Sequence, residues 1–473
     1  MPDPAGRFER SACGCCMGNL AAAMLTRRQL LAGAGIAAVA GGVLPAIGAV
    51  AAGEKKPRQQ PIRVPLRVQP VFNCHIYPRK EATSWRVTGA INDEAELRRE
   101  EEHIRSDLAA MAAGAEFPLE ILPLVTVGDA EQAAAAAKGD FDVLVIYAAR
   151  RNVPVLEALA ANDKWNLMFV RHRSGPLYYM YIGAHVHFLR KRRDEFGQPN
   201  MTVHDIVVDD HGELLWRLRA LYALKNLRGK RVVAVGGAAG WGADGRAAPD
   251  RARKTWNMDL CEVSYDDLGK RIEAARRTPE IVNRCDAAAG EYLAQPGVSL
   301  ETTREFVARA FLLDEVFRNL LDEAETDTLT VNSCMSTIMP ISETTACLPL
   351  GLLNDDGYLA FCESDFVAIP AGILLHYVAA RPVFFCNPSL PHRGIVTVSH
   401  CTAPRRMDGQ RLERVRILTH YESDYGAAPK VEMPRGQAVT VIDADFAGQR
   451  WLGFEGEIAD SPFFPICRTQ LDL

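Results

Sequence analysis

The chain has 473 residues and a formal net charge of −5, from 54 basic and 59 acidic side chains. It contains no run of Lys and Arg of the kind that follows a phosphate backbone, so we expect no nucleic-acid partner. One hydrophobic core rarely serves a chain of this length, and we therefore expect two or three domains.

The first 51 residues have the pattern of an export signal. Thr26-Arg27-Arg28-Gln29-Leu30-Leu31 is a twin-arginine motif, an apolar Gly/Ala-rich stretch follows to about Val50, and Ala49-Val50-Ala51 offers small residues for cleavage. Such a signal is an address read by a receptor and is not an anchor. We expect residues 1–51 to be removed and the protein to be periplasmic or otherwise extracytoplasmic. The alternative is an uncleaved membrane anchor, because the apolar run is about twenty residues long.

The chain that remains after this signal is acidic and carries an odd number of cysteines. The signal holds four Arg and two acids, so the mature chain has a formal charge of −7. Its nine cysteines show no C-x-x-C spacing, and several lie within apolar runs. We expect these cysteines to be buried free thiols, which behave as small hydrophobes.

After a polar, basic linker at residues 52–62, strand-like and helix-like segments alternate. The strands that we expect in this part are 65–73, 141–147, 166–170, 177–182, 231–235, 260–263, 329–332, 358–361 and 382–385. The expected helices are 93–113, 210–225, 268–277, 302–324, 343–353 and 366–379. Beyond residue 393 the helical patterns stop, and strands are expected at 395–398, 415–419, 438–442 and 451–454.

Alternation of this kind predicts an α/β protein, with parallel sheets and helices on both faces. The fold class that we expect is two doubly wound, Rossmann-like domains followed by a β-rich C-terminal part. Their expected limits are residues 63–228, 229–393 and 394–473.

Two motifs suggest ligand binding only weakly. The glycine-rich turn 236–242, which contains Trp241, follows an expected strand but lacks the G-x-G-x-x-G spacing and the P-loop Lys-Ser/Thr. We expect a structural turn there, able to line a sugar site. His185 and His187 share one face if they lie in a strand, as a metal site requires, but the alternative is a polar strand face without a third ligand.

Acids and imidazoles follow several expected strands: Glu363 and Asp365 after 358–361, His400 after 395–398 with His392 in the preceding turn, and His420 and Glu422 after 415–419. In open α/β sheets, ligands bind outside the carboxyl ends of the strands. Carboxylates with imidazoles suit a divalent cation such as Mn²⁺. The alternatives are helix capping by Asp365 and hydrogen-bonded structural roles for the single histidines. Glu363 has no such structural role.

Four motifs occur in the order found in a known group: Asn354-Asp355-Asp356-Gly357, Cys362-Glu363-Ser364-Asp365, Ser399-His400-Cys401-Thr402-Ala403-Pro404 and His420-Tyr421-Glu422-Ser423. With these motifs the sequence resembles the L-fucose isomerase / L-arabinose isomerase-like superfamily, especially its shorter members. The match is best over about residues 328–470. The resemblance implies a two-part α/β body, a β-rich C-terminal part and a homo-oligomer.

The resemblance also implies a chemistry. A Mn²⁺-type divalent cation grips adjacent sugar oxygens while an acid–base pair moves a proton between C1 and C2 through an enediol. The resemblance implies the following roles, in which Glu343 is placed by spacing alone. The catalytic pair is Glu363 and Asp365, the cation ligands are Glu343, Asp365 and His400, and the substrate contacts are His420, Glu422, His392 and Trp241.

Three functions follow as hypotheses. The first is a metal-dependent aldose–ketose isomerase that acts on a sugar or sugar acid outside the cytoplasm. The second is a carbohydrate-binding protein without turnover, favoured because Asn387-Pro388-Ser389 and His392-Arg393 stand where the group's pattern has acids. The third is an accessory subunit exported with a partner, since the twin-arginine route carries folded complexes.

Overall fold

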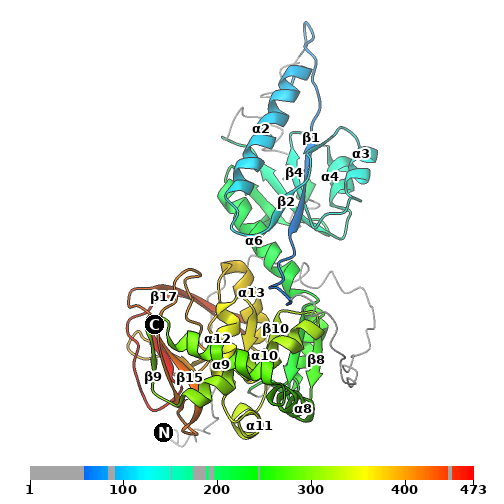
Figure 1. Ribbon diagram of the computed structural model, residues 1–473. Helices are drawn as coiled ribbons and strands as arrows, with labels where there is room; N and C mark the ends of the chain where they lie inside the picture. Colours follow the sequence, from blue (N-terminus) through cyan, green and yellow to red (C-terminus); the bar gives the residue numbers. More distant parts are fainter. Residues whose placement is uncertain are drawn as a thin grey trace, which may run out of the picture. The chain divides into compact units, whose positions relative to one another are not determined.

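The computed structural model describes residues 58–83, 91–150, 152–173, 188–190, 197–242, 245–445 and 450–473 (Figure 1). The expected signal peptide, the expected strand 177–182 and the pair His185 and His187 lie outside these residues. None of the described helices is both long enough and apolar enough to cross a bilayer. The described residues form two compact units, residues 63–226 and residues 58–62 with 227–473.

The 63–226 unit is built on a parallel sheet with the strand order β2-β1-β4-β5-β6. Its strands are β1 (Leu66–Asn73), β2 (Leu119–Ile121), β3 (Val125–Val127), β4 (Val143–Ala148), β5 (Trp165–Val170) and β6 (Ile206–Val208). β2 pairs with the first half of β1 and β3 with the second half, so the two share one position in the sheet. Every residue of β4 is buried, as expected for an interior parallel strand.

This unit contains four described helices, of which the first two begin at a residue whose side chain caps them. They are α2 (Glu94–Ala113), α3 (Ala130–Ala136), α4 (Val153–Ala160) and α6 (His211–Leu227), with a short 3₁₀ turn, η1, at Val203–Asp205. The side chain of Asp93 accepts the N–H of Glu96 at 2.8 Å, which satisfies one of the free donors at the start of α2. On the inner face of α2, Glu100 forms a fully buried ion pair with Arg171, at 2.5 Å.

The other unit contains a second parallel sheet, with the strand order β11-β10-β7-β8. These strands are β7 (Arg231–Val235), β8 (Asp259–Val263), β10 (Thr328–Val331) and β11 (Leu359–Phe361). β7 comes first in the chain and lies inside the sheet, with β8 on one side and β10 on the other. The connection after β7 leads to β8 and the connection after β10 leads to β11, in opposite directions along the sheet, so a crevice is expected between the carboxyl ends of β7 and β10.

Seven helices are described in this unit: α7 (Ala248–Trp256), α8 (Tyr265–Arg276), α9 (Pro279–Leu293), α10 (Arg304–Glu323), α11 (Met339–Ser342), α12 (Cys347–Asp355) and α13 (Ile369–Ala379). A 3₁₀ turn, η2, spans Gly245–Ala247, and a π-helical turn, η3, spans Cys334–Ile338. α10 packs against α8, α9, α12 and β10 (Figure 1), and its buried side chains form the main core with the strands of the sheet.

The C-terminal part is β-rich and mostly antiparallel. Its strands are β12 (Asn387–Pro388), β13 (Thr397–His400), β14 (Arg414–His420), β15 (Tyr425–Glu432), β16 (Ala438–Asp445), β17 (Arg450–Glu457) and β18 (Thr469–Asp472). β9 (Val298–Leu300), which lies between α9 and α10 in sequence, pairs in parallel with β14. A shared core, which includes Val307 of α10 and Ile417 of β14, joins the two parts into one unit.

The structure confirms an α/β protein with parallel sheets and an antiparallel β-rich C-terminal part. Two differences from the expected elements bear on the site. The strand expected at 382–385 does not form, and its Phe385 ring instead packs against Phe361 and His400. The helix expected at 343–353 begins at Cys347, because Glu343 takes the left-handed conformation (φ 54°) that ends α11.

The final residues of the expected linker lie along the 227–473 unit. The backbone N–H of Ile62 donates to Asp327 at 2.5 Å, and its carbonyl accepts the Tyr377 hydroxyl at 2.8 Å. Arg58 forms ion pairs with Glu315 and Asp322. Residues 58–62 are therefore part of this unit rather than a free spacer.

Candidate functional site

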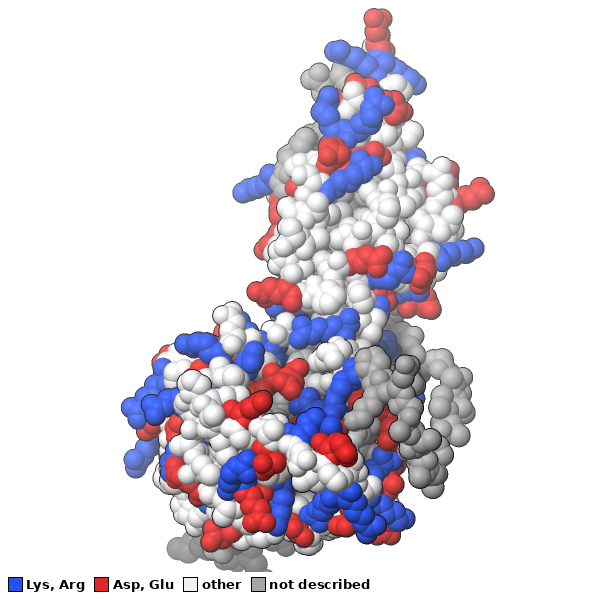
Figure 2. All heavy atoms as spheres, viewed as in Figure 1, with Lys and Arg blue, Asp and Glu red and all other residues white. Residues whose placement is uncertain are grey.

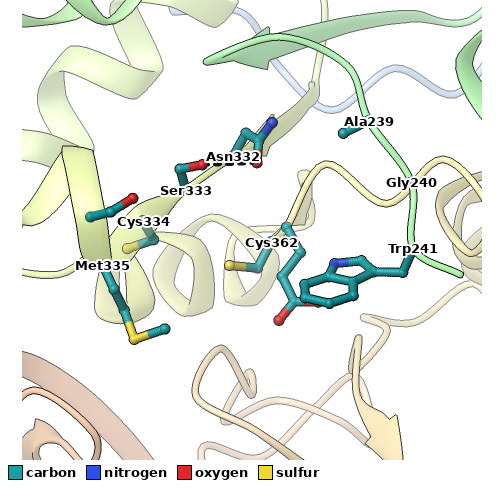
Figure 3. A pocket seen from close by; sticks show the side chains of 10 residues that line it. Ala239, Gly240, Trp241, Asn332, Ser333, Cys334, Met335 and Cys362 are labelled. Carbon is teal, nitrogen blue, oxygen red and sulfur yellow. Dashed lines mark hydrogen bonds between the residues drawn. The ribbon is translucent and has the colours of Figure 1, made fainter. Parts of the chain in front are cut away.

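A cavity of about 470 Å³ lies at the carboxyl ends of β7, β10 and β11 (Figure 3). Its lining comes from three connections: Ala239, Gly240 and Trp241 after β7, Asn332, Ser333, Cys334, Met335 and Ser336 after β10, and Cys362 and Glu363 after β11. The position matches the crevice that the strand order predicts. Its volume falls within the range of small-molecule sites, roughly 300–1,000 Å³.

The backbone leaves two of these three strands through the left-handed region. Ser333 has φ 45°, and the consecutive residues Glu363 and Ser364 have φ 62° and 46°. A residue with a side chain is strained in this region, at a cost of about 1–3 kcal/mol, and such residues gather at functional sites. At the end of β7, Gly236 (φ 80°) makes the turn, where a Cβ would lie 2.2 Å from the Tyr265 hydroxyl oxygen. The cavity wall is therefore a set of sharply turned strand ends.

Glu363 and His400 meet at this wall. Nε2 of His400 lies 3.5 Å from Oε1 of Glu363, and their side chains are 5% and 27% exposed, respectively. Nδ1 of the same ring lies 3.1 Å from the hydroxyl oxygen of Thr402, which is itself buried. The edge of the Phe385 ring contacts the imidazole. His400 is thus fixed at one nitrogen by Thr402 and presents the other to Glu363.

His420 and Glu422 lie near the Glu363–His400 pair but are not among the residues that line the cavity. His420 is buried at the end of β14, with Nδ1 3.3 Å from the Ser423 hydroxyl oxygen. Burial lowers the pKa of His420, an effect that the charge of Glu422 opposes and that of His400 reinforces. His420 is therefore expected to be neutral near pH 7. The structure brings Glu363, His400, His420 and Glu422 into one electrostatic group.

Asp365 has a mainly structural environment. One of its carboxylate oxygens, Oδ1, accepts the backbone N–H groups of Trp241 and Val367, each at 3.1 Å. Burial raises the pKa of Asp365, and these two hydrogen bonds oppose the rise. A bridge between Ala239 and Asp365 reinforces the connection. Asp365 therefore ties the turn after β11 to the turn that carries Trp241.

Glu343 and His392 lie in other surroundings. Oε1 of Glu343 is 3.5 Å from Arg276 and Oε2 is 3.3 Å from Arg309. His392 lies in an exposed turn, with Nδ1 3.3 Å from the carbonyl of Leu390. In the part of the chain that the structure describes, no three His, Cys, Asp or Glu side chains are arranged to hold a metal ion. The expected ligands Glu343, Asp365 and His400 thus do not fit a cation site as they lie.

Trp241 and Met335 border the cavity on opposite sides, with Cys362 between them (Figure 3). The Trp241 side chain belongs to a residue that is 65% exposed, so its indole is available to a ligand. Asn332, Ser333 and Ser336 add amide and hydroxyl groups. These three residues were not expected from the sequence. Asn332 ends a predicted strand, however, and the rule that ligands bind at the carboxyl ends of parallel strands, which selected Glu363, applies to Asn332 as well.

On the face seen in Figure 2, Lys and Arg are interspersed with Asp and Glu over the 227–473 unit. Among the described residues, the side chains that line the cavity include one carboxylate, Glu363, and neither Lys nor Arg. No family model matches this chain, and none of the curated proteins matches it.

Proposed function

We propose that the 227–473 unit is an enzyme that transfers protons on a sugar or sugar acid, as an aldose–ketose isomerase does. The observation that supports this most directly is the pair of Glu363 and His400, with the carboxylate at the cavity wall and the imidazole 3.5 Å behind it. A positioned carboxylate or imidazole is the usual group for proton transfer next to a carbonyl.

In this proposal Glu363 removes the proton from C2 of the aldose and returns it to C1 of the enediol. The proton on O2 passes to O1, which completes the ketose without a net gain or loss of atoms. His400 stabilises the Glu363 carboxylate through Nε2 and is held for that role by Thr402. Asn332 and Ser336 offer donors for the substrate oxygens, and Trp241 offers an apolar face for the C–H side of the ring.

A divalent cation would stabilise the enediolate oxygen. Because the expected ligands do not fit such an ion as they lie, the proton transfer proposed for Glu363 does not depend on a cation. Asp365 serves in this proposal as a positioning residue for the Trp241 turn, since both of its hydrogen bonds go to backbone N–H groups.

Membership of the L-fucose isomerase / L-arabinose isomerase-like superfamily is part of the same proposal. Its support is spatial, because the motifs at 362–365, 399–404 and 420–423 converge on the group formed by Glu363, His400 and His420. We also propose that both parallel sheets are doubly wound, since each has its first strand in the interior. An extracytoplasmic location rests on the twin-arginine motif.

A carbohydrate-binding protein without turnover remains a second candidate. It is favoured by the structural bonds of Asp365 and by the ion pairs of Glu343 with Arg276 and Arg309. Both residues were expected in the chemistry, and both are engaged elsewhere.

Deuterium exchange separates the two candidates. The mature protein is incubated in D₂O with a panel of aldoses, ketoses and uronic acids, and carbon-bound deuterium and product are followed by NMR. We expect exchange with at least one sugar, reduced about 100-fold or more in Glu363→Gln. The matched control is Glu291→Gln, which changes an exposed carboxylate on α9.

The outcomes are distinct. A ligand that raises the melting temperature without exchange would identify the binding protein. Exchange at the wild-type rate in Glu363→Gln would disprove the proposed base.

A further inference from the structure

Three cysteines from different elements meet beside His400. Cys347 begins α12, Cys401 directly follows β13, and Cys467 lies in the turn before β18. Cys347 and Cys401 form a small cluster with Ala428, and Cys467 packs against it. The thiols of both other cysteines influence the pKa of the Cys401 thiol. All nine described cysteines are free thiols, so this group is present in its reduced form.

The strand pairing brings Cys401 and Cys467 to the same end of one ladder. β13 and β18 are antiparallel, and His400 lies opposite Thr469 as the last pair. Just beyond that pair, the backbone N–H of Arg468 donates to the sulfur of Cys401 at 3.3 Å. Cys401 therefore reaches the residue next to Cys467.

The three thiols differ in access to solvent. Cys347 and Cys401 are 5% and 2% exposed, whereas Cys467 is only partly buried. A reagent from solution therefore meets Cys467 first, and Cys401 stands behind it. Cys347 packs against Cys401 and is itself buried, so it is not the first thiol that a reagent meets.

We propose that Cys401 and Cys467 are the site of a disulfide that forms when the protein meets a small-molecule disulfide. The thiolate of Cys467 attacks one sulfur of that reagent, which forms a mixed disulfide and releases one thiol. The thiolate of Cys401 then attacks the sulfur of Cys467, which forms the protein disulfide and releases the second thiol. The two cysteines lose two protons and two electrons, and the reagent is reduced to two thiols.

The surroundings set the speed of this reaction. Hydrogen bonding to Cys401, together with burial, raises the pKa of Cys467, and the nearby Glu422 and Glu363 carboxylates act in the same direction. Because the thiolate is the nucleophile, we expect slow exchange at neutral pH and faster exchange at alkaline pH. A disulfide between Cys401 and Cys467 would link the end of β13, next to His400, to the turn before β18.

The experiment uses the mature protein, folded and reduced, with oxidised glutathione as the probe. After incubation at pH 8, free thiols are alkylated in denaturant and peptides are mapped by mass spectrometry without reduction. We expect a linked peptide pair that contains Cys401 and Cys467, together with a higher melting temperature that dithiothreitol reverses. Cys401→Ser and Cys467→Ser should each abolish the linkage.

Cys347→Ser is the matched control, since it removes the third thiol and should leave the linkage intact. A wild-type protein with no linked pair, or with Cys347 joined to Cys401, would overturn the proposal. The wild-type map alone decides between these results if a variant fails to fold. No sugar is involved, so the outcome is independent of the proposed enzyme activity.

Discussion

Oδ1 of Asp365 accepts the backbone N–H of Trp241 at 3.1 Å, although the two residues are 124 positions apart in the chain. The bond joins the turn after β11 to the turn after β7, and it holds the exposed indole at the edge of the cavity. This hydrogen bond explains why position 365 carries an acid without giving Asp365 a role in proton transfer.

Substitution of Asp365 separates positioning from catalysis. Asp365→Asn keeps an acceptor oxygen for Trp241 and Val367, so we expect sugar binding and the melting temperature to stay close to wild type. Asp365→Ala leaves both N–H groups without this partner and should cost about 1–2 kcal/mol. Calorimetric titration and thermal unfolding measure the two effects. A loss of turnover of about 100-fold in Asp365→Asn, with binding intact, would instead assign the carboxylate a chemical role.

Thr402 is predicted to position His400 through the 3.1 Å contact of its hydroxyl with Nδ1. Thr402→Val is nearly isosteric but removes this partner, and we expect turnover to fall about 10- to 100-fold. Thr402→Ser keeps the hydroxyl and should retain most activity. The pH–rate profile is the decisive measurement, because it should shift in Thr402→Val and remain unchanged in Thr402→Ser. Equal profiles in all three proteins would leave Thr402 a packing residue.

Glu343 is predicted to be dispensable for turnover. Its ion pairs with Arg276 and Arg309 involve a side chain that is 44% exposed, and pairs of this kind contribute less than about 1 kcal/mol. Glu343→Gln should therefore lower stability slightly and leave kcat/KM within about twofold of wild type. The measurement is a denaturant titration beside a turnover assay. A large fall in kcat/KM that added Mn²⁺ partly restores would support the cation role that the resemblance implies.

Asp355, in the first of the four motifs, is predicted to make stability depend on pH. Its carboxylate accepts the N–H of Arg406 at 2.8 Å, and burial raises its pKa from 3.8 to about 7. Between these values the folded state binds more protons than the unfolded state. Stability from this group is therefore greatest at low pH, declines as the pH rises toward 7, and levels off above it.

Asp355→Asn keeps an acceptor for Arg406 without the charge, so it should lack this decline. Urea titrations at pH 5 and pH 8 give the comparison, and the variant should lose less stability than wild type between them. Parallel changes in the two proteins would show that Asp355 does not cause the dependence.

The site residues that could be predicted from the sequence are those whose side chains have no role in forming the secondary structure. Glu363 follows a buried strand and caps nothing, and His400 ends another strand, so both were recognisable from position alone. The role of Asp365 could not be settled in this way, because its partner Trp241 is distant in the sequence. Glu343 was placed by spacing, and spacing does not show that two arginines from α8 and α10 reach it.

The fold shows the same division. Buried strands such as β4 and β7 are continuous apolar runs and were readily predicted. The segment 382–385 is also a continuous apolar run, yet it finds no neighbouring strand and packs through Phe385 instead. Strand propensity becomes a strand only when a partner is within hydrogen-bonding reach, and that depends on the tertiary structure.

The parallel pairing of β9 with β14 also determines where this protein can be divided. Residues 298–300 occupy a place in a sheet whose other strands are synthesised more than a hundred residues later. A fragment that stopped at residue 393 would leave this strand without its partner and would bare the apolar sides of α9 and α10 to water. Unpaired strands next to apolar surface promote aggregation. The β-rich part therefore cannot be removed without exposing this shared core. For the same reason, the contact between the β-rich part and the helices is unsuited to act as a hinge.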